Sequence, residues 1–466
     1  MNKSGRNLAL EVPLIIFAIG VAFVVQMLMT PSKDPTVPHF AEVEKQEKDQ
    51  EVMNVPVPKV DKEGEIPPLK IPLTYSEELS DLGEKPDWTE LDPYQEAIRK
   101  DEFLYLLAEV FTVGDTWKNW ITIGEDSAVI RTDNQDESQN YELFFQKEGE
   151  SKKVPRYWRT REELADTPSD RPLAGLRIAI DPGHIGGNYA ALEQRRFLLN
   201  ENAAPVQEGD MTLTVANTLK DQLEALGAIV NLVREKTEPV NPFRVEQYQD
   251  YAYSKLEHNK GLSTQESVKR EADRMFYRVG EIRARARLVN YAFKPDLVLC
   301  IHFNADAQPD PANPVLFEQE HFHMLLNGAY TAGEVEHEDE RFIMILKILQ
   351  GIHQEEAKLA NAAATAFVRE AGLPPYEYEP NSRRAVNVDG NPYLWARNLI
   401  ANRLYECPVV YYEPYLMNGK DSYARMQMGD YDGLRYVNGQ LRRSIYREYV
   451  DAVTEGLVEY YTENAK

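Results

Sequence analysis

Two histidines and two glutamates stand where their side chains could share one site. His184 follows the apolar run LRIAID (176–181), His302 ends the run LVLCIH, and Glu413 ends the run PVVYYE (408–413). Each run is typical of a buried β-strand, and in open α/β sheets ligands and catalytic groups gather beyond the carboxyl ends of parallel strands. Glu208 lies just before an amphipathic stretch that we expect to be helical from about residue 211, so a short loop could bring it to the same edge.

These residue types indicate a zinc site. Two neutral imidazoles and one carboxylate are suitable ligands for Zn²⁺, which then keeps a fourth position for water. A further carboxylate nearby could take the proton of that water, because the metal lowers its pKa to about neutrality. The candidates are far apart in the sequence, and neither an HExxH nor a CxxC spacing is present to fix the assignment.

Other interpretations of the same residues stay open. A histidine that ends a strand is often only a polar residue that meets solvent, as His302 would be without partners. Glu193 and Glu201 lie in the same loop as Glu208 and could replace it as a ligand. Glu413 could instead form a buried ion pair with an arginine such as Arg403.

A second pair of histidines is a rival site. His321 and His323 alternate on one face of a short expected strand. We find no carboxylate in the sequence placed to complete a ligand set around them. The pair is therefore interpreted as cleft lining or surface.

Four blocks in order resemble the zinc-dependent N-acetylmuramoyl-L-alanine amidases known as amidase 3: IAIDPGHIGG, VQEGDMTLTVANTLKDQLEALGAIVNLVRE, RARLVNYAFKPDLVLCIHFNA and CPVVYYEPYLMN. The resemblance covers most of residues 175–460. It implies that His184, Glu208 and His302 bind zinc, and that Glu413 is the general base for the zinc water. Ile185, Cys300 and Pro414 depart from the family pattern, which leaves loop geometry and substrate preference open.

The implied reaction is hydrolysis of the amide between N-acetylmuramic acid and L-alanine in peptidoglycan, for cell-wall remodelling or daughter-cell separation. Rival functions are a non-catalytic wall-binding or division-scaffold module that keeps the fold, and another zinc peptidase that acts on free peptides. Cleavage of the sugar chain would need two carboxylates across a groove and no metal.

Strands and helices alternate from Leu173 onward, which predicts an α/β domain with a mainly parallel twisted sheet and helices on both faces. Helices are expected over 209–227, with Asp210 as the N-cap, over 281–293, and around PYLWARNLIANRLY. A further strand is expected over 228–233. Cys300 and Cys407 are flanked by apolar residues and are interpreted as buried thiols.

The chain is strongly acidic, with 52 basic and 76 acidic side chains and a net charge of −24. This charge disfavours nucleic acid as a partner. Residues 1–30 contain an uncharged stretch, 12–29, preceded by Lys3 and Arg6. This pattern predicts an uncleaved single-pass anchor in the inner (cytoplasmic) membrane of a bacterium, with the catalytic domain on the periplasmic or extracytoplasmic side; a cleaved signal peptide is the nearest alternative.

Three segments follow the anchor. Residues 31–91 are rich in proline and charge and are expected to be a disordered linker. Residues 92–165 are expected to form a small α+β accessory module, and residues 173–466 the catalytic domain. Two long insertions, 236–280 and 308–355, could cover the cleft as a lid, in which case a protein activator is expected.

Overall fold

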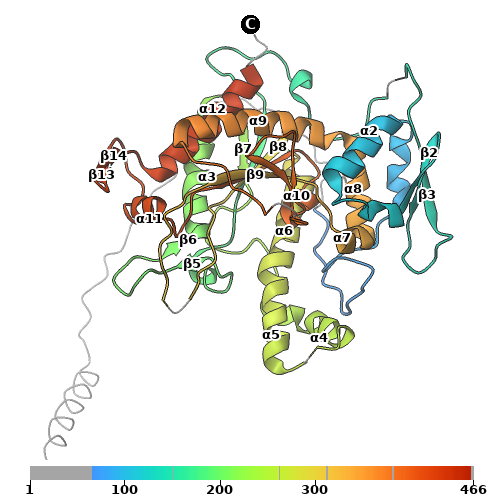
Figure 1. Cartoon of the computed structure of the whole chain (residues 1–466), viewed down its shortest axis with the longest axis horizontal. Coiled ribbons are helices and arrows are strands. Elements are labelled where there is room, and N and C mark those ends of the chain that lie inside the picture. Colours follow the sequence, from blue (N-terminus) through green and yellow to red (C-terminus); the bar gives the residue numbers. More distant parts are fainter. Residues whose placement is uncertain (1–65, 151, 262, 311–312, 380–381, 463–466) are drawn as a thin grey trace, which may run out of the picture. The chain divides into compact units, whose positions relative to one another are not determined.

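The computed structural model describes residues 66–150, 152–261, 263–310, 313–379 and 382–462 (Figure 1). The anchor predicted within residues 1–30 lies outside the described residues, as does the linker up to residue 65. In the described part of the chain, no helix has both the length and the apolar character needed to span a membrane.

A seven-stranded sheet, in the order β10-β11-β9-β12-β8-β4-β7, forms the centre of the protein. Its strands are β4 (Arg177–Pro182), β7 (Ile229–Leu232), β8 (Leu297–Ile301), β9 (Phe322–Leu326), β10 (Val386–Asn387), β11 (Leu394–Ala396) and β12 (Val409–Pro414). β7, β4, β8 and β12 run parallel, whereas β9 pairs antiparallel with β12 and parallel with β11. The prediction of a mainly parallel sheet with helices is confirmed.

Each central strand is predominantly apolar because both faces of the sheet are covered. Ile178 and Ile180 of β4 pack into a core with α3 (Glu208–Ala225), α9 (Ile352–Ala371) and α12 (Ile445–Thr462). Ala179, between them, points to the opposite face, where the core contains residues of α6 (Glu281–Arg287) and α10 (Ile400–Leu404). This alternation repeats along β8 and β12, so side chains two residues apart share a face.

Helices α9 and α12 lie across one another on their side of the sheet (Figure 1). A β-carbon on Gly456 of α12 would come within 2.8 Å of the Cα of Ala363 in α9, so the crossing requires a glycine there. On the opposite side, α5 (Gln265–Arg274), two wider helical turns and α6 form an unbroken helical run from Gln265 to Phe293. The helix expected over 281–293 is the end of that run.

Two sequence expectations about local structure were wrong. The segment around PYLWARNLIANRLY contains a strand, β11, before the short helix α10, because three residues are too short to show a strand period. Helix α3 begins at Glu208, not near residue 211, and Asp210 is in its first turn, where its carboxylate accepts from the backbone N–H of Gly187 at 3.2 Å.

The accessory segment forms a three-stranded antiparallel sheet, β1 (Ile121–Ile123), β2 (Ser127–Arg131) and β3 (Asn140–Phe144), with helix α2 (Lys100–Tyr105). Its core is continuous with that of the large sheet, because Ile130 of β2 and Leu143 of β3 belong to the same cluster of buried residues as Ile178 of β4. Residues 66–91, expected to be part of a disordered linker, also pack on the domain. The backbone N–H of Ser80 donates to Asp339 at 2.8 Å, and Leu91 is fully buried.

The two insertions differ in structure. Residues 236–280 contain the hairpin of α4 (Gln249–His258) and α5, which projects away from the sheet (Figure 1). Residues 308–355 contain β9, α7 (Ala332–Glu336) and α8 (Glu338–Gln350). Because β9 lies inside the central sheet, this second segment is largely part of the core and not a lid.

Asp296, directly before β8, forms buried ion pairs with two arginines. Asp296→Ala is therefore expected to lower the free energy of unfolding by about 3 kcal/mol. The fully buried carboxylate pairs with Arg159 at 2.6 Å and Arg177 at 2.7 Å, and removal of the carboxylate leaves both cations unpaired. Urea unfolding measures the loss. Asp115→Ala, at an exposed ion pair, should change the value by less than about 1 kcal/mol.

The same carboxylate predicts a pH dependence. Burial raises the pKa of Asp296, but hydrogen bonds from Arg159 and Arg177 outweigh burial and bring it below the ordinary value. A lowered folded-state pKa means that the stabilisation is complete above the unfolded-state pKa and is lost as the pH falls through the folded-state pKa. The stability gap between wild type and Asp296→Asn should therefore shrink in acid; a gap that widens below about pH 4 would contradict this assignment.

Candidate metal centre

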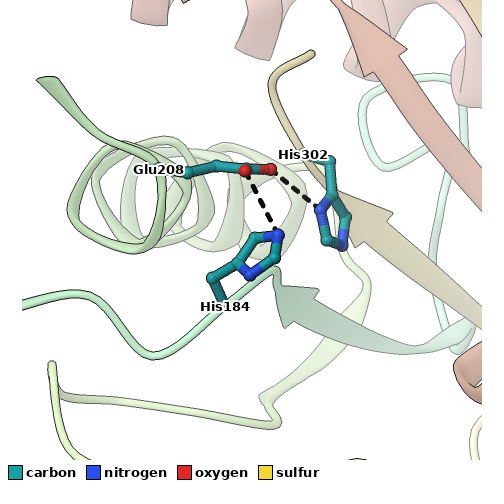
Figure 2. Close-up of side chains that lie close together, drawn as sticks. All are labelled: His184, Glu208 and His302. Carbon is teal, nitrogen blue, oxygen red and sulfur yellow. Dashed lines mark hydrogen bonds and ion pairs between the residues drawn. The ribbon is translucent and has the colours of Figure 1, made fainter. Parts of the chain in front are cut away.

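Three of the predicted residues meet at the carboxyl edge of the sheet, each from a different element (Figure 2). His184 follows β4, Glu208 opens α3, and His302 follows β8. One Glu208 oxygen lies 3.1 Å from Nε2 of His184, and the other lies 3.0 Å from Nδ1 of His302. One potential ligand atom from each residue falls within 4.8 Å of the others. Among the described residues, no other set of three or more His, Cys, Asp or Glu side chains has this geometry.

Local backbone geometry fixes both histidines. His184 takes a left-handed conformation, with φ of +59°, which turns its ring back toward the start of α3. The ring of His302 lies against Gly183, where any β-carbon would collide with it. On its other side, His302 stacks on the Tyr411 ring at 4.4 Å between centroids. The DPGH sequence thus supplies a candidate ligand and the space for the second imidazole.

The charges in this cluster suit a cation. Burial raises the pKa of Glu208, but the neighbouring His184 and His302 outweigh burial and lower it to about 2. The carboxylate is therefore ionised at neutral pH. Burial lowers the pKa of the His184 imidazole, which favours the neutral form that binds metals. Burial also acts to lower the pKa of His302, but Glu208 and Glu413 outweigh burial and raise it, so a metal would have to displace a proton from that ring. Two imidazoles and one ionised carboxylate are a donor set that Zn²⁺ accepts.

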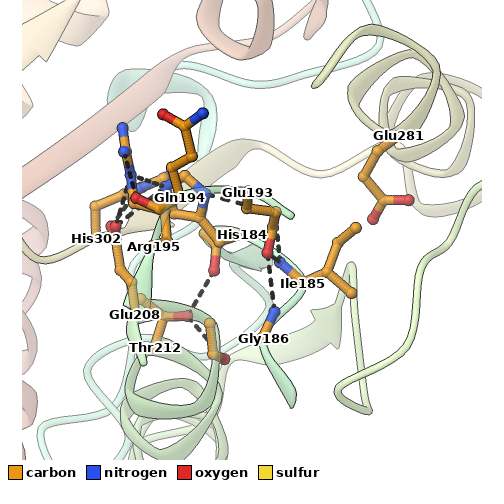
Figure 3. Close-up of polar contacts among 12 residues, drawn as sticks. His184, Ile185, Gly186, Glu193, Gln194, Arg195, Glu208, Thr212, Glu281 and His302 are labelled. Carbon is orange, nitrogen blue, oxygen red and sulfur yellow. Dashed lines mark hydrogen bonds and ion pairs between the residues drawn. The ribbon is translucent and has the colours of Figure 1, made fainter. Parts of the chain in front are cut away.

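Glu193 holds His184 in place and does not substitute for Glu208 (Figure 3). Its buried carboxylate accepts from the backbone N–H groups of Ile185 at 2.9 Å and Gly186 at 3.1 Å, and lies 3.5 Å from Nδ1 of His184. Glu201, the other alternative to Glu208, is exposed. A carboxylate behind a ligating histidine orients its ring and raises its basicity.

Glu193→Gln is therefore expected to weaken zinc binding by about 10- to 100-fold while leaving all three ligands present. Competition with a chromogenic chelator measures the affinity. Glu201→Gln, in the same loop but exposed, is the matched control and should bind zinc as the wild type does. Equal zinc affinities of the two variants would show that Glu193 does not support metal binding.

Glu413 is the penultimate residue of β12 and lines the same pocket as the three candidate ligands. Burial raises the pKa of its carboxyl to about 7, with His302 acting in the opposite direction. The alternative ion pair with Arg403 is wrong, because that arginine pairs with Glu340 at 3.2 Å. Glu413 is thus a carboxylate near its titration point beside a candidate metal position.

The rival histidines lie beside this pocket and are buried. His323 of β9 is the cross-strand partner of Glu413, and His321 has its Nε2 3.7 Å from Asp306. Their rings pack against Tyr376, with centroids 4.7 and 4.8 Å away. The sequence interpretation that placed this pair of histidines on the surface is therefore wrong.

Several pocket residues had no sequence signal. The cavity of about 420 Å³ is also lined by Arg195, Arg278 and Arg397. The Nε–H of Arg195 lies 3.2 Å from Oε2 of Glu208 and donates to Nε2 of His184 at 3.2 Å. Arg278 comes from the insertion 236–280, so this insertion contributes one wall of the pocket. Cys300 and Cys407 are free and buried, as predicted.

Comparisons with known proteins agree with the sequence blocks. No family model matches the chain. Over 138 residues it is 29% identical to the germination-specific N-acetylmuramoyl-L-alanine amidase of Bacillus subtilis (strain 168). The match covers 30% of this chain and 43% of that relative, so the chain spans less than half the length of the relative. The resemblance to N-acetylmuramoyl-L-alanine amidases is confirmed.

Solved structures similar to this chain include Ami1, an N-acetylmuramyl-L-alanine amidase from Mycobacterium smegmatis. It is 17% identical with a TM-score of 0.34, over 63% of this chain and 99% of that one. The CwlD amidase from Clostridioides difficile, in complex with the GerS lipoprotein, is 14% identical with a TM-score of 0.34, over 62% of this chain and 98% of that one.

Proposed function

We propose that this chain is a zinc-dependent N-acetylmuramoyl-L-alanine amidase, which hydrolyses the amide between N-acetylmuramic acid and the L-alanine of the peptidoglycan stem peptide. The observation that carries the proposal is the meeting of His184, Glu208 and His302 in one pocket with Glu413. The matched region of the Bacillus subtilis amidase supports the choice of substrate.

The three ligand residues would hold the metal through two imidazole nitrogens and one carboxylate oxygen. When bound, zinc supplies the Lewis acidity that polarises the lactyl carbonyl and acidifies a water molecule. Glu193 keeps the ring of His184 oriented, and the Tyr411 ring holds that of His302. The burial of Glu208 excludes competing water from its side chain.

Glu413 moves the proton in this reaction. A pKa near 7 places its carboxylate close to the pH at which it can both accept and donate a proton. Its carboxylate takes a proton from the attacking water and delivers it to the nitrogen of the departing L-alanine. The delivery is needed because an amine leaves poorly unless it is protonated.

The substrate of the proposed reaction implies a location for the described domain. Peptidoglycan lies outside the cytoplasmic membrane, so the described domain would act on the extracytoplasmic side, held by an anchor within residues 1–30. Protection of the domain from added protease in intact spheroplasts would contradict that location. A protein activator stays a prediction.

The test combines zinc content with product analysis on the full chain in detergent. We expect one zinc per chain and release of stem peptides free of muramic acid from purified peptidoglycan. New reducing ends without free peptide would indicate sugar cleavage, and activity on free peptides alone would indicate an exopeptidase. Zinc without any release would favour a binding module, and absence of zinc would overturn the proposal.

A further inference from the structure

Two arginines in the pocket have no anionic partner among the described residues. Arg278, in the turn that follows α5, and Arg397, directly after β11, both line the cavity that contains His302 and Glu413. In the described part of the chain, neither guanidinium group has a carboxylate within 4.0 Å. Arg285, in the same pocket wall, differs because it pairs with Asp181 at 2.7 Å and Glu281 at 2.8 Å.

Arg397 is held beside the reacting groups. Its backbone N–H donates to the carbonyl of Leu326 at 2.9 Å, which fixes the end of β11 against β9. Its side chain is half-buried, and its positive charge reaches both Glu413 and the Tyr378 hydroxyl, where it lowers their pKa values against the larger effect of burial. With no carboxylate of the described residues in contact, the guanidinium group of Arg397 keeps hydrogen-bond donors available for an anionic ligand at this wall of the pocket.

We propose that Arg397, assisted by Arg278, binds a carboxylate of the stem peptide, namely the α-carboxylate of the second residue, D-glutamate. This inference rests on the proposed function. A guanidinium group binds a carboxylate through two parallel hydrogen bonds, a geometry that a neutral amide cannot reproduce. One extended residue spans roughly 3.5 Å, so the group that follows L-alanine lies about one residue beyond the bond that Glu413 would act on.

The charge of the whole protein supports this role. With a net charge of −24, the protein repels an anionic substrate at long range, so local cations are needed where its carboxylate binds. Arg278 and Arg397 come from separate elements, the insertion and the sheet edge. A substrate carboxylate between them would join the two walls of the pocket.

Calorimetry on the zinc-loaded full chain tests the inference without turnover. The protein is the Glu413→Gln variant, and the ligands are N-acetylmuramoyl-L-alanyl-D-glutamate and its α-amide, the D-isoglutamine form. We expect the free carboxylate to bind about 10- to 100-fold more tightly than the amide. Arg397→Gln in the same background should remove this preference, and Arg278→Gln should reduce it.

The control is Arg270→Gln, which removes an exposed arginine of α5 outside the pocket and should leave the preference unchanged. Zinc content of each variant verifies that the site still folds. Equal binding of the two ligands, or no binding of either, would overturn the subsite, as would a preference that survives Arg397→Gln. Failure of the wild-type chain to release stem peptides would overturn the proposed function alone, because the binding preference does not depend on hydrolysis.

Discussion

Glu413→Gln is expected to lower the turnover of peptidoglycan by about 10³-fold while zinc content stays at the wild-type level. The amide keeps the size and polarity of the side chain but cannot accept the proton of water at neutral pH or return it to the leaving amine. Glu413 lies outside the set of three candidate ligands, so the metal should remain bound. Release of stem peptides, followed with zinc content on the same samples, measures both effects.

Glu201→Gln is the matched control for this variant, since it makes the same chemical change at an exposed position in the loop before Glu208. It should retain the activity of the wild type. Activity of Glu413→Gln within a few fold of wild type would show that another group moves the proton. Loss of zinc from that variant would instead make Glu413 a ligand.

The sequence grouped the candidate site residues more accurately than it placed the elements around them. β4, β8 and β12 are predominantly apolar, so the runs before His184, His302 and Glu413 were recognisable as buried strands. Because these strands pair in parallel, their carboxyl ends lie at one edge of the sheet, and this does not depend on the conformation of the connecting loops. That is why residues far apart in the chain could be grouped from the sequence pattern alone.

The start of α3 could not be predicted in the same way. Asp210 has the residue type of an N-cap, which predicts a helix from residue 211, yet the helix begins three residues earlier, where the N–H of Glu208 donates to the carbonyl of Arg195 at 3.1 Å. Gly209 then packs so closely on Gly186 that a β-carbon would collide with its backbone. Both are contacts across a loop, and nothing in the local pattern specifies them.

Arg397 was missed for a related reason. It follows a three-residue strand that becomes recognisable only when β9 pairs with it, and the surrounding sequence resembles a helix. The role of Glu193 was also open, because three glutamates share one loop and only the fold distinguishes them. Glu208 faces both histidines, Glu193 lies behind one of them, and Glu201 faces solvent.

Glu208→Gln is expected to abolish hydrolysis by removing the metal, and not by removing a proton acceptor. The carboxylate contacts both histidines and is the negative charge in the candidate ligand set, so its amide should weaken zinc binding by at least about 100-fold. Zinc at 100 times its dissociation constant stabilises the wild-type fold by about 2.7 kcal/mol. Thermal unfolding with and without zinc should therefore show a shift in Tm for the wild type and for Glu413→Gln, and almost none for Glu208→Gln. A full zinc-dependent shift in Glu208→Gln would mean that other residues hold the metal, and the assignment of the opening residue of α3 as a ligand would be wrong.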